Sequence, residues 1–196
     1  MFIQVMQGRI ADAEHLKRQV DRWRSELKPG ARGYLGATSG VTSDGRAITL
    51  VRFESEDAAR ANAARPEQGA WWAETAKAFD GDVTFHDCKE TDSALGGGSN
   101  DAGFVQVLQG RAKNQKDMRK LLPTVEKELH AARPDILGIT IGWHGDGRFT
   151  QAVYFTSEKA ARDGESAKGN EELREQFMSN IDGQPVFFDL TAPDLD

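Results

Sequence analysis

Histidine is the side chain in this sequence best suited to acid–base chemistry near neutral pH, and four occur among 196 residues. His86 lies in the strand-like stretch VTFHDC, and His144 follows Trp143 at the end of the stretch ILGITIGW. A lone histidine without an assigned partner is more often a surface residue or a satisfied core residue. His86 is therefore a candidate catalytic residue and His144 a candidate ligand-binding residue, with a structural role as the alternative for both.

Amide and guanidinium groups on apolar strands form a second set of candidates. Gln4 and Gln106 interrupt otherwise apolar stretches, so each either satisfies backbone groups or faces a pocket. Arg52 could orient an anionic or phenolic ligand, with a surface or ion-pair role as the alternative. Tyr154 occupies the matching place in the second half of the chain. We take Gln4 and Arg52 as candidate catalytic residues, and Gln106 and Tyr154 as candidate ligand-binding residues.

Tryptophan side chains could form the wall of a pocket for a flat ligand. Trp71 and Trp72 are adjacent on a predicted helix, so their side chains point about 100° apart. One of them should pack in the core while the other faces a pocket or the solvent. Trp143 precedes His144 in the second half. All three are candidate ligand-binding residues, with core packing as the alternative.

Sequence signatures of bound cofactors and metals are missing. The sequence contains no phosphate-binding loop, no dinucleotide fingerprint and no His/Glu pair at the helical spacing of a metal site. Cys88 is the single cysteine, which excludes an internal disulfide and a cysteine-built metal site. We expect neither a cofactor nor a metal.

Composition excludes some classes of partner. The net charge of −6 argues against general binding to nucleic acid or to anionic membranes, both of which attract basic patches. No apolar run approaches the roughly 18 residues of a membrane span, and no signal peptide is recognisable. We expect a cytoplasmic protein whose partner is a small aromatic molecule.

An internal repeat sets the architecture. FIQVMQGR at 2–9 returns as FVQVLQGR at 104–111, and VRFESEDAAR at 51–60 returns as VYFTSEKAAR at 153–162. The small, polar and Gly-rich segment 91–102 between the copies has linker composition. The sequence therefore predicts two repeats of about 90 residues each, at 1–90 and 103–196, joined by an irregular linker.

Each repeat reads as a ferredoxin-like β-α-β-β-α-β unit. In the first repeat we predict strands at 2–9, 34–41, 46–54 and 82–88, a helix over 11–28, and a second helix that Ser55 caps and Pro66 interrupts. The strands are apolar on both faces, which requires cover on both sides. The sheet of one repeat should therefore pack against the sheet of the other, as an intrachain pseudo-dimeric α+β barrel. The whole chain would be a monomer or a homodimer.

The element order and the paired stretches YLGATSG and ILGITIG resemble the dimeric α+β barrel superfamily, and within it the antibiotic-biosynthesis-monooxygenase-like domains. The resemblance covers both repeats. It implies activities that range from cofactor-independent oxygenation of quinol-like aromatics to haem degradation. The haem-degrading members use an Asn, a Trp and a His at places that hold Gln4, Asn62 and Trp71 here. Without an axial histidine, haem degradation is disfavoured.

Two functional hypotheses follow. One is a cofactor-independent monooxygenase that acts on a small aromatic substrate, and the other is a non-catalytic small-molecule-binding or interaction module. If one repeat carries a pocket, we expect the first, because the second has Leu173, Arg174 and Phe188 at the places of Trp71, Trp72 and His86. Trp71 or Trp72 would then form the wall, with Gln4, Arg52 and His86 as the polar groups.

Overall fold

The computed structural model describes residues 1–166 and 171–196, and its first half follows the predicted order of strands and helices. The elements are β1 (Phe2–Ile10), α1 (Ala13–Arg22), a π-helical turn (Trp23–Leu27), a 3-10 turn (Lys28–Gly30), β2 (Tyr34–Val41), β3 (Arg46–Phe53), α2 (Glu56–Ala63), α3 (Pro66–Thr75), a second 3-10 turn (Ala76–Ala78) and β4 (Phe79–Cys88).

The second half repeats this order. Its elements are β5 (Glu90–Ala94), β6 (Phe104–Ala112), α4 (Gln115–Ala132), β7 (Ile136–Trp143), β8 (Arg148–Phe155), α5 (Glu158–Ser166), α6 (Glu171–Ser179), β9 (Ile181–Leu190) and the short β10 (Asp194–Leu195).

Local signals in the sequence place the element boundaries. The Ser55 side chain accepts a hydrogen bond from the N–H of Ala58 and caps α2, as predicted. Gly45 and Gly147 have φ angles of +81° and +82° in the two hairpin turns, where a side chain would be strained.

A short strand near the end of each half of the chain pairs with the sheet of the other half. The strand orders are β10-β2-β3-β1-β4 and β5-β7-β8-β6-β9, so β5 extends the second sheet and β10 extends the first. The prediction that 91–102 is an irregular linker is wrong at its start, because Thr91 to Ala94 form a strand that pairs with β7. The free edge of β7 offers unpaired backbone groups, which a polar segment can satisfy as well as an apolar one.

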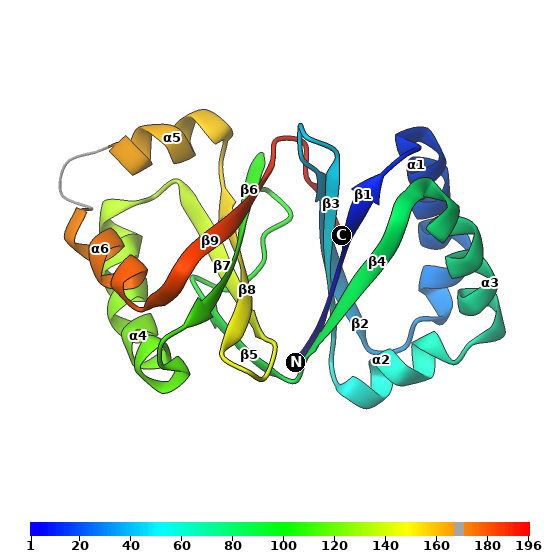
Figure 1. Cartoon of the computed structure of the whole chain (residues 1–196), viewed down its shortest axis with the longest axis horizontal. Coiled ribbons are helices and arrows are strands. Elements are labelled where there is room, and N and C mark those ends of the chain that lie inside the picture. Colours follow the sequence, from blue (N-terminus) through cyan, green and yellow to red (C-terminus); the bar gives the residue numbers. More distant parts are fainter. Residues whose placement is uncertain (167–170) are drawn as a thin grey trace.

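The two sheets face each other at the centre of the molecule, and the helices cover their outer faces (Figure 1). The central core contains residues from both sheets: Ile3, Val5, Ile48, Leu50 and Cys88 from the first, and Val105, Val107, Ala152, Tyr154, Phe188 and Leu190 from the second. This confirms the predicted packing of sheet against sheet. The sheets remain two separate five-stranded layers and do not close into a hydrogen-bonded barrel.

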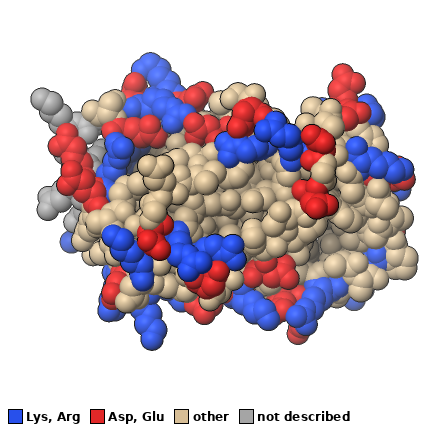
Figure 2. Space-filling view, viewed as in Figure 1, with Lys and Arg blue, Asp and Glu red and all other residues tan. Residues whose placement is uncertain are grey.

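Charged side chains of both signs lie along the margins of one face, and the centre of that face carries few of them (Figure 2). The edge strands β4 and β9 cross this region in the same view (Figure 1) and expose Phe85 and Phe187. None of the helices within residues 1–166 and 171–196 has the length and apolar character that a membrane span requires.

Candidate functional site

A buried polar cluster lies where the two sheets meet. Arg52 projects from β3 into the space between the sheets and is 9% exposed. Its Nη1 donates hydrogen bonds of 3.1 Å to the Thr38 hydroxyl and 3.1 Å to the Tyr154 hydroxyl. The Thr38 and Tyr154 hydroxyls are also hydrogen-bonded to each other, at 2.6 Å. Arg52 therefore joins the first repeat to the second through a network of three side chains.

Strand register explains why these side chains meet. Arg52 lies opposite Gly36 on β2, and Tyr154 lies opposite Gly138 on β7. A Cβ at Gly36 would come within 2.6 Å of the Arg52 Nη2, so the glycine leaves room for the guanidinium. The two glycines belong to the repeated stretches YLGATSG and ILGITIG, but at Gly138 the space is taken by the main-chain oxygen of Gly97, 1.7 Å from where a Cβ would lie.

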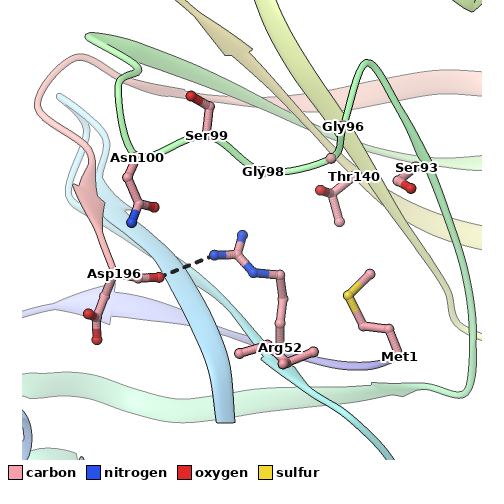
Figure 3. A pocket seen from close by; sticks show the side chains of 11 residues that line it. Met1, Arg52, Ser93, Gly96, Gly98, Ser99, Asn100, Thr140 and Asp196 are labelled. Carbon is pink, nitrogen blue, oxygen red and sulfur yellow. Dashed lines mark hydrogen bonds between the residues drawn. The ribbon is translucent and has the colours of Figure 1, made fainter.

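Arg52 also faces a cavity of about 600 Å³, which we call the inter-sheet pocket (Figure 3). The segment from Gly96 to Asn100 crosses above the guanidinium in this view, and Asp196 lies at its side. The residues that line the pocket come from both repeats and the segment between them: Met1, Leu35, Arg52, Ser93, Gly96, Gly97, Gly98, Ser99, Asn100, Thr140 and Asp196.

Thr140 brings an unpaired hydroxyl to this pocket. It is 1% exposed, and its Oγ1 has no hydrogen-bond partner in the described part of the protein. Thr38 is the equivalent residue of the first repeat, and its hydroxyl is fully used by Arg52 and Tyr154. Buried hydroxyls are normally hydrogen-bonded, so Thr140 is an unsatisfied polar group in the wall of this pocket.

The one carboxylate side chain among the lining residues is held by other groups. Asp196 Oδ1 accepts a short hydrogen bond from Lys28, and Oδ2 accepts one of 3.0 Å from the Tyr34 hydroxyl. Burial alone would raise the pKa of Asp196, but these hydrogen bonds outweigh it and hold the pKa below its usual value. Burial, together with the neighbouring Asp196 charge, raises the pKa of Tyr34. Asp196 is consequently a poor proton acceptor.

A second polar cluster joins the sheets at His86 and His144. Their rings stack with centroids 4.3 Å apart and planes 15° apart. His144 Nε2 lies 2.9 Å from the Thr150 hydroxyl, and its Nδ1 is buried without a partner among the described residues. Burial lowers the pKa of His86, and burial plus the nearby His86 and Arg148 charges lower the pKa of His144 to about 4. Both imidazoles are therefore neutral at pH 7.

The two histidines pack on each other and are not positioned at the inter-sheet pocket, whose lining includes neither. Within the described residues, no three His, Cys, Asp or Glu side chains come together as a metal site would require. Cys88 is buried, and burial raises the pKa of its thiol to about 12, so the thiol is unreactive at neutral pH.

The predicted pocket walled by tryptophan does not form, because its members lie on opposite faces of the first sheet. Trp72 packs on the helix side against Phe79 and Phe85. Phe85 and His86 are neighbours on β4, so their side chains point to opposite faces. Trp71 lies in the same helical layer, and its Nε1 donates to the main-chain oxygen of Gln19. The prediction that Trp71 or Trp72 lines one pocket with His86 and Arg52 is therefore wrong.

Gln4 and Gln106 have matching structural partners instead of a shared pocket. Gln4 donates to Asp87 at 2.8 Å, and Gln106 donates to Asp189 at 3.0 Å across the neighbouring strand. Trp143 is 2% exposed and packs against Phe149 in the core of the second repeat. Of the predicted site residues, Arg52 and Tyr154 are the two that come together beside the inter-sheet pocket.

Sequence reasoning missed Thr38, Thr140 and the glycine segment 96–98. The repeat did contain a signal, because threonine recurs at the same place in YLGATSG and ILGITIG. Composition marked the glycines as a linker, whereas Gly98 lies so close to Arg52 that a Cβ there would be 2.5 Å from Nη1.

Solved structures share the fold of this protein over nearly the whole chain. A candidate monooxygenase from Fusobacterium nucleatum aligns with 100% of this chain and 93% of its own, at 9% identity and a TM-score of 0.76. A candidate monooxygenase from Lactobacillus acidophilus covers 100% and 98%, at 14% identity and a TM-score of 0.70. An anthrone oxidase-like protein covers 99% and 93%, at 10% identity and a TM-score of 0.63.

A ferredoxin-fold protein from Listeria monocytogenes, related to antibiotic biosynthesis monooxygenases, has the same fold at a TM-score of 0.50. This chain has the antibiotic-biosynthesis-monooxygenase-like fold in tandem duplication. No protein-family model matches the sequence, and no curated protein matches it significantly. At such low identity the likeness establishes the fold, so any function must be argued from the site.

Proposed function

We propose that this protein binds a small aromatic, quinol-like molecule in the inter-sheet pocket and oxygenates it without a bound cofactor. The observation that carries the proposal is the cavity of about 600 Å³ at whose wall Arg52 lies, backed by the Thr38 and Tyr154 hydroxyls. Ligand pockets combine a concave surface with a few well-placed polar groups. The names of the structural neighbours, two candidate monooxygenases and an anthrone oxidase-like protein, support this reaction class.

The reaction needs no external reductant when the substrate supplies the electrons. The acidic ring CH₂ beside a carbonyl loses a proton to solvent water, and the resulting carbanion reduces O₂. One oxygen atom stays on the carbon as a ketone and the other leaves as water, so CH₂ plus O₂ gives C=O plus H₂O. The positive charge of Arg52 would stabilise negative charge that develops on the substrate and on the reduced oxygen.

Oxygen uptake tests the proposal. An oxygen electrode would record consumption with a panel of hydroquinones and anthrones, before and after dialysis against EDTA, with heat-denatured protein as the control for autoxidation. We expect uptake above autoxidation for at least one substrate, unchanged by EDTA and reduced at least tenfold in Arg52→Gln. Uptake that never exceeds the denatured control would contradict the oxygenase activity.

The second candidate is a non-catalytic binding module. The hydrogen bonds that hold the Asp196 side chain favour this alternative. The carboxylate that lines the pocket is held by Lys28 and Tyr34 and so is a poor acceptor for a substrate proton. Binding of the same aromatics by calorimetry, without oxygen uptake for any of them, would select this alternative.

A further inference from the structure

Arg52 has hydrogen-bond donors that the protein leaves unused. A guanidinium carries five N–H groups. Nη1 gives two hydrogen bonds, to Thr38 and Tyr154, and Nη2 gives one of 3.2 Å to the main-chain oxygen of Asp196. The Nε–H and one Nη2–H therefore have no acceptor among the described residues. Among the side chains that the structure describes, none forms an ion pair with Arg52.

Thr140 presents the complementary group in the same cavity. Its hydroxyl is buried and unpaired, and it reaches the pocket from β7 of the second repeat, while Arg52 reaches it from β3 of the first. The glycine segment passes close to both side chains: a Cβ on Gly97 would be 3.8 Å from Thr140 Oγ1, and one on Gly98 would be 2.5 Å from Arg52 Nη1. Two unused donors of Arg52 and the unpaired hydroxyl of Thr140 thus belong to residues that line the same pocket.

We infer that the ligand binds as an anion, with an ionised aromatic hydroxyl held between Arg52 and Thr140. This inference rests on the proposed use of the inter-sheet pocket. Buried charges are normally paired, because an unpaired charge away from water is unfavourable. An oxyanion accepts two or three hydrogen bonds, which matches the donors available here, and charge-assisted hydrogen bonds are about twice as strong as neutral ones. A neutral phenol would accept fewer of these hydrogen bonds than its oxyanion does, although the Asp196 carboxylate on the same pocket already supplies one negative charge near Arg52.

A chromogenic phenol reports the ionisation state of the bound ligand directly. 4-Nitrophenol absorbs at longer wavelength when ionised, so a pH titration of the bound probe gives its pKa in the site. We expect binding to lower this pKa by about 1 or more, since a cation within about 4–6 Å shifts an acid by about 1–3. Arg52→Gln should abolish the shift, and Arg52→Lys should restore part of it.

Thr140→Val keeps the test informative if the Arg52 variants fold poorly. It should weaken binding of the ionised probe about tenfold, the effect of one hydrogen bond of about 1.4 kcal/mol. 4-Nitrobenzoate tests whether a carboxylate satisfies the site as well. 4-Nitrobenzamide is the neutral control, and we expect it to bind at least tenfold more weakly than the ionised phenol.

Three results would overturn the inference: no binding of 4-nitrophenol up to its solubility limit, an unshifted pKa on binding, or equal affinity for the neutral amide. Oxygen uptake separates this inference from the proposed function. Uptake of quinols by a protein that binds 4-nitrophenol only in its neutral form would retain the oxygenase and overturn the anion site. A lowered pKa without any uptake would support the anion site and remove the oxygenase.

Discussion

Arg52 and Tyr154 occupy the same position in the two repeats, and the guanidinium of one donates a hydrogen bond of 3.1 Å to the phenol of the other. Equivalent positions of a duplicated domain meet where the two sheets face each other. Divergence at this one position turned a pair of identical residues into a donor and an acceptor. The two repeats are therefore asymmetric beside the inter-sheet pocket, which Arg52 lines.

The equivalent threonines should respond differently to the same substitution. Thr38→Val removes one of the acceptors of Arg52 and a partner of Tyr154, so we expect it to lower the free energy of unfolding by about 1–3 kcal/mol. Thr140→Val removes a buried hydroxyl that has no partner among the described residues, so stability should stay within about 0.5 kcal/mol or rise. Urea denaturation of both variants measures the difference. Equal losses would show that Thr140 has a partner in the folded protein.

The His86–His144 stack should make stability depend on pH. The folded-state pKa of each imidazole lies below its ordinary value of 6.5, with that of His144 at about 4. Below pH 6.5 the unfolded chain takes up protons that the folded protein resists, so stability should fall between pH 6.5 and 4. Arg148 and Asp146 also face the pair, and their effects on its pKa values oppose each other.

Two variants isolate this effect from general acid denaturation. His144→Thr, which introduces the side chain that Thr42 has at the equivalent position, should flatten the loss of stability over this range. His86→Phe, which introduces the side chain that Phe188 has in the second repeat, should flatten it partly, because burial of His144 persists. Chemical denaturation at several pH values would measure the slopes, and slopes parallel to that of the wild type would show that the stack does not carry the dependence.

Close backbone packing at Gly138 should make this position intolerant of a side chain. A Cβ there would lie 1.7 Å from the main-chain oxygen of Gly97, so the glycine segment would have to move. We expect Gly138→Ala to reduce stability by about 3 kcal/mol or more. Gly69 is the matched control, because it lies in α3 with nothing within 4 Å of its Cβ. Gly69→Ala should stabilise by up to about 1 kcal/mol in thermal denaturation. A tolerated Gly138→Ala would contradict this packing.

The fold followed from the sequence because its signals are local or repeated. The strands predicted at 34–41 and 46–54 appear as Tyr34–Val41 and Arg46–Phe53, on either side of an Asp-Gly turn. Strands that are apolar on both faces must be buried on both faces. The helices cover one face of each sheet, and the sheet of the other repeat covers the second. The exchanged strands β5 and β10 gave no such signal, since both are short and polar and gain their structure by pairing with a distant edge.

The site was harder to predict because it depends on contacts between distant residues. Arg52 and Tyr154 were both candidates, but their hydrogen bond requires the relative placement of two sheets, which no local pattern specifies. The predicted tryptophan pocket was wrong because the alternation of side chains along a strand, and not residue type, decides which of them share a face. Val5 pairs with His86 and faces the central core, so His86 faces inward and Phe85 faces the helices with Trp72. The sequence shows that Phe85 and His86 point to opposite faces, but it does not show which of the two faces the core, because that depends on the pairing between distant strands.

We propose that ligands bind between the sheets, at Arg52, and not beside the helices at Trp72. The most direct measurement is the affinity of one quinol-like ligand for Arg52→Gln and Trp72→Leu, determined by calorimetry beside the wild type, with circular dichroism to confirm folding. We predict that Arg52→Gln weakens binding at least tenfold while Trp72→Leu leaves it within about twofold. Loss of binding in Trp72→Leu with full affinity in Arg52→Gln would contradict the account and place the site under the helices of the first repeat.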